Sequence, residues 1–348
     1  MRVLMKGNEA VGRAAIEAGC NCFFGYPITP QSELPEYLSR ELPLAGGVFV
    51  QSESEVAAIN MVYGAAAAGK RVMTSSSSPG IALKQEGIGY ISRANVPAVI
   101  VNMMRAGPGL GGIQPSQADY RMCVKGGSNG DYHNIVLAPS SVQEAVDMVM
   151  QGFDLADKYL IPVIILADGL IGQMMEAVEI KYKPLADLPA KDLALKGKGD
   201  GARHLVLNLD LEAEGLEKIC LAMEKKYQRI RQQERAWEEY LLEDAESVFV
   251  AYGTTARIVK SAVQILRKKG YKIGLIRPKT LWPFPQAPFK RPFQKFMVVE
   301  MSLGQMIEDA RLAIMDDSKI SFYGRTGGVV PTTDEIVTYA EKILRGDE

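Results

Sequence analysis

The sequence contains few cysteines, no excess of charge of either sign and no long apolar run. Its four cysteines, Cys20, Cys22, Cys123 and Cys220, include no C-x-x-C pair, so their spacing predicts neither a disulfide framework nor a metal or cluster site in this chain. Forty basic against 41 acidic residues leave a net charge of −1, which argues against a nucleic-acid-binding surface and against a face attracted to membranes. We therefore expect a cytoplasmic protein with reduced thiols.

Segments for targeting or membrane insertion are also lacking. The longest apolar runs, at 96–104 and 161–172, are shorter than the roughly 20 residues that span a bilayer. The N-terminal stretch MRVLMKGNEAVG has neither an apolar core nor a cleavage site. We therefore expect no signal peptide and no membrane partner.

The chain does contain a globular composition and a clear alternation of elements. Its 348 residues, 47% of them hydrophobic, are too many for one ordinary core and predict two or three domains. In its first half, short apolar strands alternate with helices, which indicates a mostly parallel, doubly wound α/β sheet. A charged pattern at 211–246 predicts a bridging helix or helix pair, after which the α/β alternation returns. We predict α/β domains at 1–182 and 245–348, joined by a connector and bridging helix at 183–244.

The loops at the carboxyl ends of the strands are the candidate sites, because ligands of open α/β sheets bind there. The first loop, GYPITPQSE at 25–33, places Thr29 between Pro27 and Pro30, and the two prolines restrict its backbone. The Thr29 hydroxyl and the amides of the following helix suit a carboxylate or phosphate oxygen. A proline-rich turn with a helix cap explains the same residues, so the pattern alone leaves both interpretations open.

Glu55 begins a helix of small residues, EVAAINMVYGAAAAG, just past the strand GGVFVQ. Small side chains let such a helix pack closely, and a carboxylate at its start is then desolvated and has a raised pKa. A glutamate in a first turn is also an ordinary surface residue that complements the helix dipole. Glu53 lies two residues earlier and is the competing candidate.

Two further strand ends carry polar groups. The stretch TSSSSPG at 74–80 supplies hydroxyls that suit a ring or an anion, or a simple turn. Arg105 follows the strand VIVNMM, where its planar fork suits a carboxylate, although a surface ion pair is the common use of such an arginine. The segment GPGLGG at 107–112 is a weak match to a dinucleotide fingerprint, because Pro108 interrupts it and no apolar helix follows.

No metal-binding pattern stands out. The G-D-G stretch at 199–201 and the A-D-G stretch at Asp168 lack an asparagine at the distance that a magnesium–diphosphate motif requires. His133 and His204 have no cysteine or aspartate partners at ligand or nucleophile spacing. We expect these histidines to be surface or polar-cluster residues.

Taken together, several stretches resemble the alpha subunit of 2-oxoacid:ferredoxin oxidoreductases. The resemblance covers essentially the whole chain and rests on GNEAVGRAAIEAGCNCFFGYPITPQSE, QSESEVAAINMVYGAAAAGKRVMTSSSSPG, MMRAGPGLGGIQPSQADY and RPKTLWPFP. It implies a doubly wound domain of the type that binds the aminopyrimidine of thiamine diphosphate, followed by a smaller α/β domain like the C-terminal domain of transketolase.

The resemblance also implies roles for single residues. Glu55 matches the glutamate that hydrogen-bonds the pyrimidine nitrogen and promotes loss of the proton at the thiazolium C2. Thr29 and Arg105 match contacts to the substrate carboxylate, while Glu33 is a helix-start residue. Ser78 stands where relatives often have glycine, which puts the detail of that loop in question. The cofactor contacts implied are Glu55, Pro27, Ile28, Ser77 and Ser78.

In this family, oxidative decarboxylation of a 2-oxoacid yields CO₂ and an acyl-coenzyme A, and the electrons pass to ferredoxin. The resemblance implies a hetero-oligomer in which a beta subunit carries the diphosphate and Mg²⁺ site. A gamma subunit and a ferredoxin-like subunit with iron–sulfur clusters complete it. The segment MRAGPGLGGIQPSQADY is most similar to the branched-chain type, which acts on 2-oxoisovalerate.

The sequence is also compatible with other functions. Within the family, 2-oxoglutarate, pyruvate or an aryl pyruvate are alternative substrates, since apolar pockets discriminate poorly between neighbouring sizes. A thiamine-dependent decarboxylase or transketolase half is the alternative enzyme. A nicotinamide-binding α/β protein and a non-catalytic scaffold subunit are alternatives of other classes.

Overall fold

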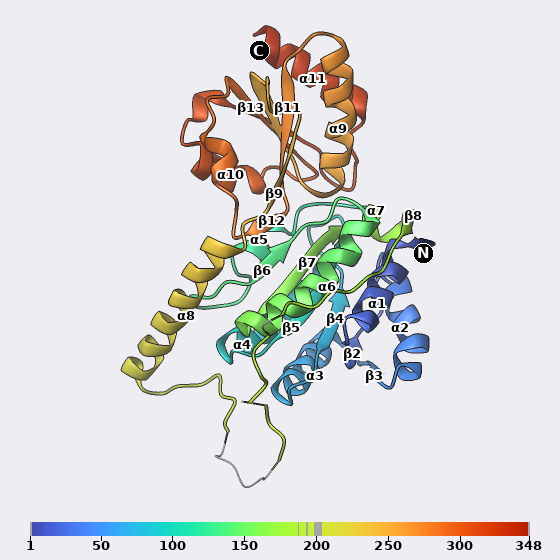
Figure 1. Cartoon of the computed structure of the whole chain (residues 1–348), viewed down its shortest axis with the longest axis vertical. Helices are drawn as coiled ribbons and strands as arrows, with labels where there is room; N and C mark the ends of the chain where they lie inside the picture. Colours follow the sequence, from blue (N-terminus) through green and yellow to red (C-terminus); the bar gives the residue numbers. More distant parts are fainter. Residues whose placement is uncertain (1, 187, 193, 198–203, 347–348) are drawn as a thin grey trace.

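The computed structural model describes residues 2–186, 188–192, 194–197 and 204–346. Two α/β units lie one above the other along the longest axis, and a long helix projects beside the lower unit (Figure 1). The G-D-G stretch at 199–201 lies outside the described residues.

The lower unit is built around a seven-stranded sheet. From one edge to the other its strands are β12 (Thr280–Trp282), β6 (Ile135–Leu137), β7 (Pro162–Asp168), β5 (Ala98–Met104), β4 (Val72–Ser76), β2 (Cys22–Gly25) and β3 (Val48–Gln51). All neighbours are parallel except β12 and β6. The apolar runs of β5 and β7 are buried along their whole length, as expected where helices cover both faces. The predicted doubly wound sheet is confirmed.

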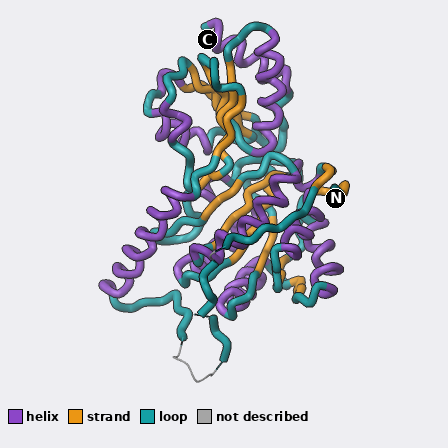
Figure 2. The backbone as a smooth tube through the Cα atoms, viewed as in Figure 1, coloured by secondary structure: helices purple, strands orange, loops and turns teal. Residues whose placement is uncertain are grey.

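Helices cover this sheet on both faces (Figure 2). On one face α1 (Gly7–Glu17) packs against α2 (Glu33–Leu44) and α6 (Val142–Tyr159), and on the other α3 (Glu55–Ala67) packs against α4 (Ser78–Arg93). Two short helices, α5 (Tyr120–Val124) and α7 (Gly169–Gln173), follow the loop after β5 and the end of β7. A separate two-stranded antiparallel sheet joins β1 (Val3–Lys6) to β8 (Met175–Val178).

The upper unit contains a five-stranded sheet. Its order is β14 (Ile320–Gly324), β13 (Lys295–Glu300), β10 (Ser247–Val250), β11 (Ile273–Pro278) and β9 (Trp237–Tyr240), with only β9 antiparallel to its neighbour. Helices α9 (Gly253–Lys268) and α11 (Thr333–Arg345) pack together, while α10 (Met306–Ile314) lies on the other side of the sheet (Figure 1). Two short 3₁₀ helices span Ala287–Lys290 and Asp317–Lys319.

The bridging segment differs in part from the prediction. One helix, α8 (Ala213–Gln233), is present, but the predicted helix through residue 246 is wrong, because residues 237–240 form strand β9 instead. Glu238 of β9 lies directly opposite Arg277 of β11, and this cross-strand ion pair favours the strand over a continued helix. A second long-range pairing places β12, from the range predicted for the C-terminal domain, at the edge of the lower sheet. The proposed domain limits remain a prediction.

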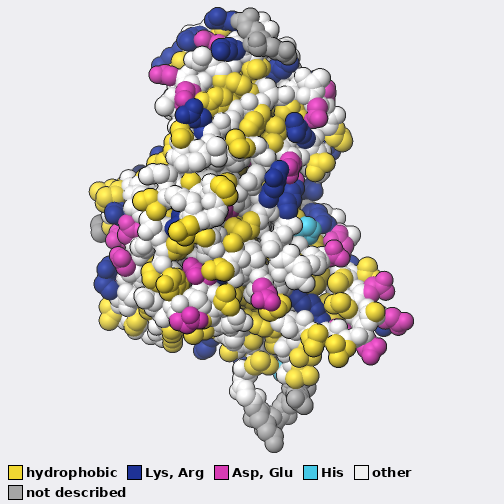
Figure 3. Space-filling model, turned by 180° about the vertical axis from the view of Figure 1, so that it is seen from behind, with side chains coloured by type: hydrophobic (Ala, Val, Ile, Leu, Met, Phe, Trp, Pro, Cys, Tyr) yellow, Lys and Arg dark blue, Asp and Glu magenta, His cyan; other side chains and the backbone are white. Residues whose placement is uncertain are grey.

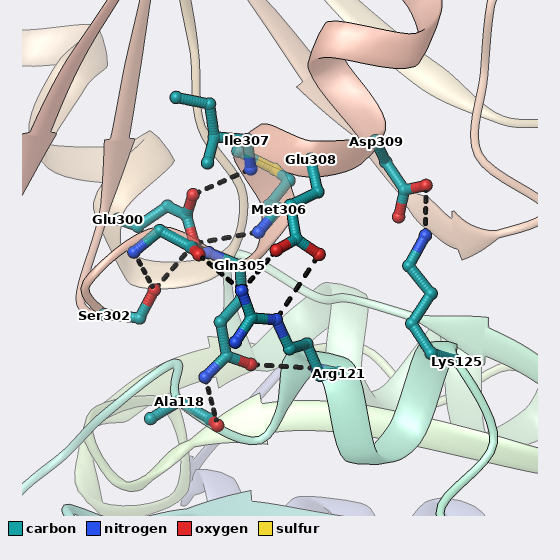
Figure 4. Close-up of polar contacts among 11 residues, drawn as sticks. Ala118, Arg121, Lys125, Glu300, Ser302, Gln305, Met306, Ile307, Glu308 and Asp309 are labelled. Carbon is teal, nitrogen blue, oxygen red and sulfur yellow. Dashed lines mark hydrogen bonds and ion pairs between the residues drawn. The ribbon is translucent and has the colours of Figure 1, made fainter.

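Polar contacts join the two units (Figure 4). The side-chain oxygen of Gln305 accepts a hydrogen bond from the amide of Arg121 at 2.9 Å, and its nitrogen donates to the main-chain oxygen of Ala118 at 2.7 Å. These contacts fix the loop after β5 against the upper unit. Two ion pairs to α10 reinforce these hydrogen bonds. Arg121 of α5 pairs with Glu308, and Lys125, just after α5, pairs with Asp309.

Glu300 holds α10 in the orientation that these contacts require. Its fully buried carboxylate, at the end of β13, accepts hydrogen bonds from the amides of Met306 and Ile307 at 3.0 and 2.9 Å. A carboxylate at a helix N-terminus satisfies amides that have no partner within the helix. Glu300 therefore anchors the first turn of α10 above the lower unit (Figure 4).

Arg277 forms a second link between the units. Its side chain is 1% exposed and donates from Nη2 to Glu144 of α6 at 2.6 Å and from Nε to Glu238 at 2.7 Å. Burial alone would raise the pKa of the Glu144 carboxyl. The charges of Arg277 and Lys279 and a hydrogen bond from the Ser140 amide outweigh burial and lower this pKa to about 2. This folded-state pKa is below the unfolded value of about 4.3. The ionised Glu144 carboxylate therefore contributes its full share to the free energy of unfolding above about pH 4.3. This contribution is lost as the pH falls towards 2.

The face of the molecule seen from behind shows no strong polarity of charge (Figure 3). Seen from behind, the residues drawn in colour mix Lys and Arg with Asp and Glu, and neither sign dominates that face (Figure 3). Within the described part of the chain, no helix is both long enough and apolar enough to cross a membrane.

Replacing Arg277 tests the link between the units. We expect Arg277→Ala to lower the free energy of unfolding by roughly 1–3 kcal/mol, because it removes the buried cation that two half-buried carboxylates share and leaves Glu144 with Lys279 and Glu238 with Lys260. Urea denaturation at pH 7 measures this change. As a control, Arg311→Ala removes an exposed arginine that lies 3.5 Å from Asp317, and should cost less than about 1 kcal/mol. Equal effects of the two substitutions would contradict the prediction.

Candidate functional site

The predicted site residues follow four neighbouring strands of the lower sheet. Strands β5, β4, β2 and β3 are adjacent and parallel, so their carboxyl ends lie at one edge. Arg105 follows β5, Ser77 and Ser78 follow β4, Thr29 follows β2, and Glu55 follows β3. The topology thus brings together residues that are 76 positions apart, such as Thr29 and Arg105.

The Thr29 loop is held by its main chain. The main-chain oxygen of Thr29 accepts a hydrogen bond from Arg105 Nη1 at 2.9 Å. The main-chain oxygen of Pro30 accepts two more, from Asn8 and Gln173, both at 2.8 Å. The Thr29 side chain is exposed, as is Pro27, while Ile28 is half-buried. The loop is therefore fixed from behind, with the Thr29 side chain open to solvent.

Glu33 serves the same loop and has no sign of a catalytic role. Burial raises the pKa of its carboxyl, but hydrogen bonds from its own amide, Asn8, Gln173 and Lys6 outweigh burial and lower it. Asn8 and Gln173 each donate to Glu33 Oε2 at 2.8 Å. The carboxylate thus ties α2 to α1 and α7, which agrees with its interpretation as a helix-start residue.

The structure separates the two glutamates that compete for the second strand end. Glu53 is exposed, whereas Glu55 is 6% exposed and begins α3. Ser54 between them caps α3 by accepting a hydrogen bond from the amide of Ala57 at 3.2 Å. Among the described residues, none donates a hydrogen bond to the Glu55 carboxylate. The carboxylate of Glu55 is therefore buried, and its oxygen atoms are available to accept hydrogen bonds from a ligand.

Gly80, in the first turn of α4, makes room for that carboxylate. A Cβ atom at Gly80 would lie 2.5 Å from Glu55 Oε1 and 2.1 Å from Ser76 Oγ. Real Cβ atoms essentially never approach other atoms so closely, so only glycine fits here without movement. The N-terminus of α4 thus lies close to the Glu55 carboxylate.

The serines at the end of β4 and just after it are of two kinds. Ser76 and Ser77 are fully buried, and their Oγ atoms have no hydrogen-bond partner among the described residues. Ser78 instead joins an internal network: its Oγ accepts from the amide of Arg105 at 3.0 Å and donates to Asp119 Oδ2 at 2.6 Å. The predicted cofactor contact through Ser78 therefore competes with a structural role.

Arg105 lies at the centre of this network. Its side chain is buried, and besides the bond to Thr29 it donates from Nη2 to the main-chain oxygen of Leu110 at 3.0 Å. Its Nε is buried without a partner among the described residues. Arg105 is therefore not the exposed surface arginine of the alternative interpretation, and it joins the Thr29 loop to the segment 106–112.

Asp119 was not anticipated from the sequence. Burial raises the pKa of this carboxyl, and hydrogen bonds from Ser78 and Asn102 oppose the rise, as does the charge of Arg105. Asn102, in the middle of the apolar strand β5, donates to Asp119 at 2.9 Å. An asparagine within AVIVNMM was the one available signal, because a polar side chain in a buried strand requires a partner.

The segment 106–112 is an irregular loop. Gly109 and Gly111 have φ of +67° and +60°, which favour glycine, and the next helix begins only at Tyr120. A dinucleotide fingerprint requires a helix directly after its glycines, so the structure disfavours the nicotinamide alternative. A cavity of about 640 Å³ lies beside this loop. Its lining includes Ser78, Ala82, Leu83, Met122 and Leu303.

The other residues considered for metal binding have structural roles. The described residues contain no cluster of three or more histidine, cysteine, aspartate or glutamate side chains that could hold a metal ion. Asp168 caps α7 and accepts from Thr254 Oγ1 at 2.8 Å. His133 stacks on Trp282 with ring centroids 4.6 Å apart, and His204 is exposed.

Comparison with protein families divides the chain into two matched regions. Residues 13–237 match the family model described as pyruvate flavodoxin/ferredoxin oxidoreductase, thiamine diphosphate-binding. Residues 245–336 match the model described as pyruvate:ferredoxin oxidoreductase core domain II.

Related proteins extend this result over most of the chain. The ketoisovalerate oxidoreductase subunit VorB of Methanothermobacter marburgensis is 52% identical over 313 residues, covering 89% of each chain. The 2-oxoglutarate synthase subunit KorA of Methanocaldococcus jannaschii is 37% identical, covering 95% of this chain and 97% of that protein.

Solved structures agree on the fold. The 2-oxoglutarate:ferredoxin oxidoreductase from Magnetococcus marinus, with 2-oxoglutarate, coenzyme A and succinyl-CoA bound, superposes with a TM-score of 0.88 at 29% identity. The match covers 98% of this chain and 65% of that one. A split-gene transketolase in an inactive tetramer has a TM-score of 0.60 at 13% identity and shows a shared fold.

Substituting glycines tests the space around Glu55. We expect Gly80→Ala to destabilise the chain by roughly 1–3 kcal/mol, because the new methyl group displaces Ser76 and the Glu55 carboxylate. Gly64→Ala in the exposed part of α3, where a Cβ meets nothing within 4 Å, should instead stabilise by up to about 1 kcal/mol. Urea denaturation compares both variants with the parent chain. A neutral Gly80→Ala would show that the contact is looser than described.

Proposed function

The chain belongs to the family of thiamine-diphosphate-binding 2-oxoacid:ferredoxin oxidoreductase subunits, and on this premise we propose that it is the subunit that activates the cofactor and holds 2-oxoisovalerate for oxidative decarboxylation. One observation carries the proposal. A buried Glu55 carboxylate without a donor among the described residues lies in the same row of strand ends as Arg105 and Thr29. The substrate preference rests on the likeness to the two ketoisovalerate oxidoreductase subunits.

The residues present fit thiamine diphosphate. An aminopyrimidine ring offers nitrogen atoms that form hydrogen bonds, and this strand end offers the free acceptor Glu55 and the unpartnered hydroxyls of Ser76 and Ser77. Pro27 and Ile28, on the neighbouring loop, supply apolar surface for the ring. When bound, the cofactor supplies the carbon nucleophile and the electron sink for decarboxylation.

Glu55 holds a proton for the cofactor. Glu55 lies at the start of α3, near the N-terminus of α4, and its carboxylate oxygen can accept a hydrogen bond from a ring N–H. Burial excludes water from this contact and strengthens it. Glu55 is thus the general acid–base group of this chain.

Arg105 and Thr29 position the substrate. The bond from Arg105 Nη1 to the Thr29 main chain fixes the guanidinium, and the substrate carboxylate takes the place of the Leu110 oxygen at Nη2. Glycines at 107, 109, 111 and 112 let the Leu110 segment move aside. The Thr29 hydroxyl, exposed on the adjoining loop, donates a second hydrogen bond to the same carboxylate.

The remaining components belong to partner subunits. Related chains are named as subunits of oxidoreductases, so this chain functions within a hetero-oligomer. A beta subunit supplies the diphosphate and Mg²⁺ site, while a gamma subunit and a ferredoxin-like subunit complete the assembly. Iron–sulfur clusters of that assembly would carry the electrons to ferredoxin, and coenzyme A would accept the acyl group. The chain spans 65% of the Magnetococcus chain, and these assignments rest on family likeness.

The role of Glu55 can be tested in the assembled complex. We expect Glu55→Gln to lower kcat by about 100-fold or more, because an amide cannot hold the proton. Glu53→Gln, two residues away and exposed, is the matched control and should retain activity. Reduction of ferredoxin with saturating 2-oxoisovalerate and coenzyme A measures turnover. Unchanged turnover of the Glu55 variant would indicate a scaffold subunit.

The substrate preference requires a panel of 2-oxoacids. We expect the native complex to have its highest kcat/KM with 2-oxoisovalerate and a value about 10–200-fold lower with pyruvate, which fills less of an apolar pocket. Purification of the complex from its native cell followed by steady-state assays measures this order. A higher kcat/KM for 2-oxoglutarate would overturn the assignment.

A further inference from the structure

Lys84, which the proposed function does not use, is buried beside Glu55. Its side chain lies in α4 and is 0% exposed. Lysine is almost never fully buried without a partner, because its ammonium loses strong hydration. Here Nζ donates to the main-chain oxygen of Glu55 at 3.4 Å, and it forms no ion pair with a carboxylate among the described residues. Two of its three ammonium hydrogens therefore have no acceptor among the described residues, which makes a purely structural role costly.

The helix packing places Lys84 against the start of α3. Gly80, Lys84 and Gly87 lie on one face of α4, at a spacing of one helical turn. Cβ atoms at Gly80 and Gly87 would lie 2.5 Å from Glu55 Oε1 and 2.5 Å from Ile59 Cγ2. Both glycines thus allow α4 to lie close along α3, and the lysine between them extends towards the first turn of α3.

Glu55 is the charged group that faces Lys84. It is the one charged residue of α3, and strands β4 and β5 contain none. Asp168 at the end of β7 is bound to α7 and Thr254. On α4 itself, Glu86 is exposed and accepts from Tyr90. Arg105 and Asp119, which are also buried, are bound to Ser78 at the start of α4. Among the described residues, Glu55 is the charged group that raises the pKa of Lys84 against the effect of burial.

We propose that Lys84 is a positioning residue whose ammonium holds the start of α3 and lowers the proton affinity of the Glu55 carboxyl. A cation near a carboxyl favours its ionised form, and low polarity strengthens the effect. Burial lowers the pKa of Lys84 to about 8, and the charge of Glu55 opposes this fall. The ammonium is therefore mostly charged at pH 7 and is lost above about pH 8, which couples the basicity of Glu55 to pH. The coupling between Lys84 and Glu55 does not depend on the proposed function. Its effect on catalysis does, because that effect requires Glu55 to be the acid–base group.

The coupling is measured on the full-length chain without cofactor. In chain carrying ¹³C at the glutamate carboxyl carbons, Glu55→Gln identifies the Glu55 signal, and its shift against pH gives the titration midpoint. We expect Lys84→Met to raise this midpoint by about one unit or more. Lys70→Met, at an exposed lysine three residues after the end of α3, is the control and should leave the midpoint unchanged. A midpoint in Lys84→Met within about 0.3 units of the parent would overturn the proposal.

A reciprocal measurement keeps the test decisive if Lys84→Met does not fold. Two coupled sites shift each other equally, so the titration of the Lys84 ammonium, followed by ¹⁵N signals, must move to lower pH in Glu55→Gln. An unmoved Lys84 midpoint contradicts the coupling. Both titrations are independent of turnover, so they distinguish failure of this inference from failure of the proposed function, which the Glu55→Gln assay in the complex reports.

Discussion

The contact between Arg105 and the main chain of Thr29 is the constraint on which the site depends. It connects the loops that follow two strands of the lower sheet, β5 and β2, across a separation of 76 residues. Ser78 extends the contact to the end of β4 through the amide of Arg105. Three strand ends thus share one hydrogen-bonded network. A site built on rigid strand ends in this way is held more precisely than a site on free loops.

The same network concentrates ionisable groups in a region with little water. Asp119 and Arg105 are buried near each other, and Glu55 and Lys84 are buried on the neighbouring helices α3 and α4. Each buried charge destabilises the fold unless hydrogen bonds and an opposite charge compensate it. Asp119 has such compensation from Ser78 and Asn102, whereas Glu55 and Lys84 have less. Incomplete compensation is typical of groups that act on a ligand rather than on the fold.

The sequence predicted the lower sheet and the candidate residues better than the long-range pairings. Continuous apolar runs such as AVIVNMM indicate buried parallel strands without further information, and the order of strands then groups Thr29, Glu55 and Arg105. The sequence could not decide between Glu53 and Glu55, because burial depends on how α3 packs against α4. Strand β9 was missed because its charged residues continue a helical pattern, and its pairing with Arg277 is visible only in three dimensions. Asp119 was missed for the same reason: its partners Ser78 and Asn102 lie far from it in sequence.

The upper unit contributes to the site without placing any of the predicted residues in it. Gln117, two residues before Asp119, donates to the main-chain oxygen of Tyr252 at 2.8 Å and accepts from the amide of Met301 at 2.9 Å. These bonds fix the segment that carries Asp119, and Asp119 in turn orients Ser78 beside Arg105. The position of Arg105 therefore depends on the contact between the two units. This dependence gives a physical reason for the two matched regions to occur in one chain: the second supports the segment that holds Asp119, Ser78 and Arg105 in the first.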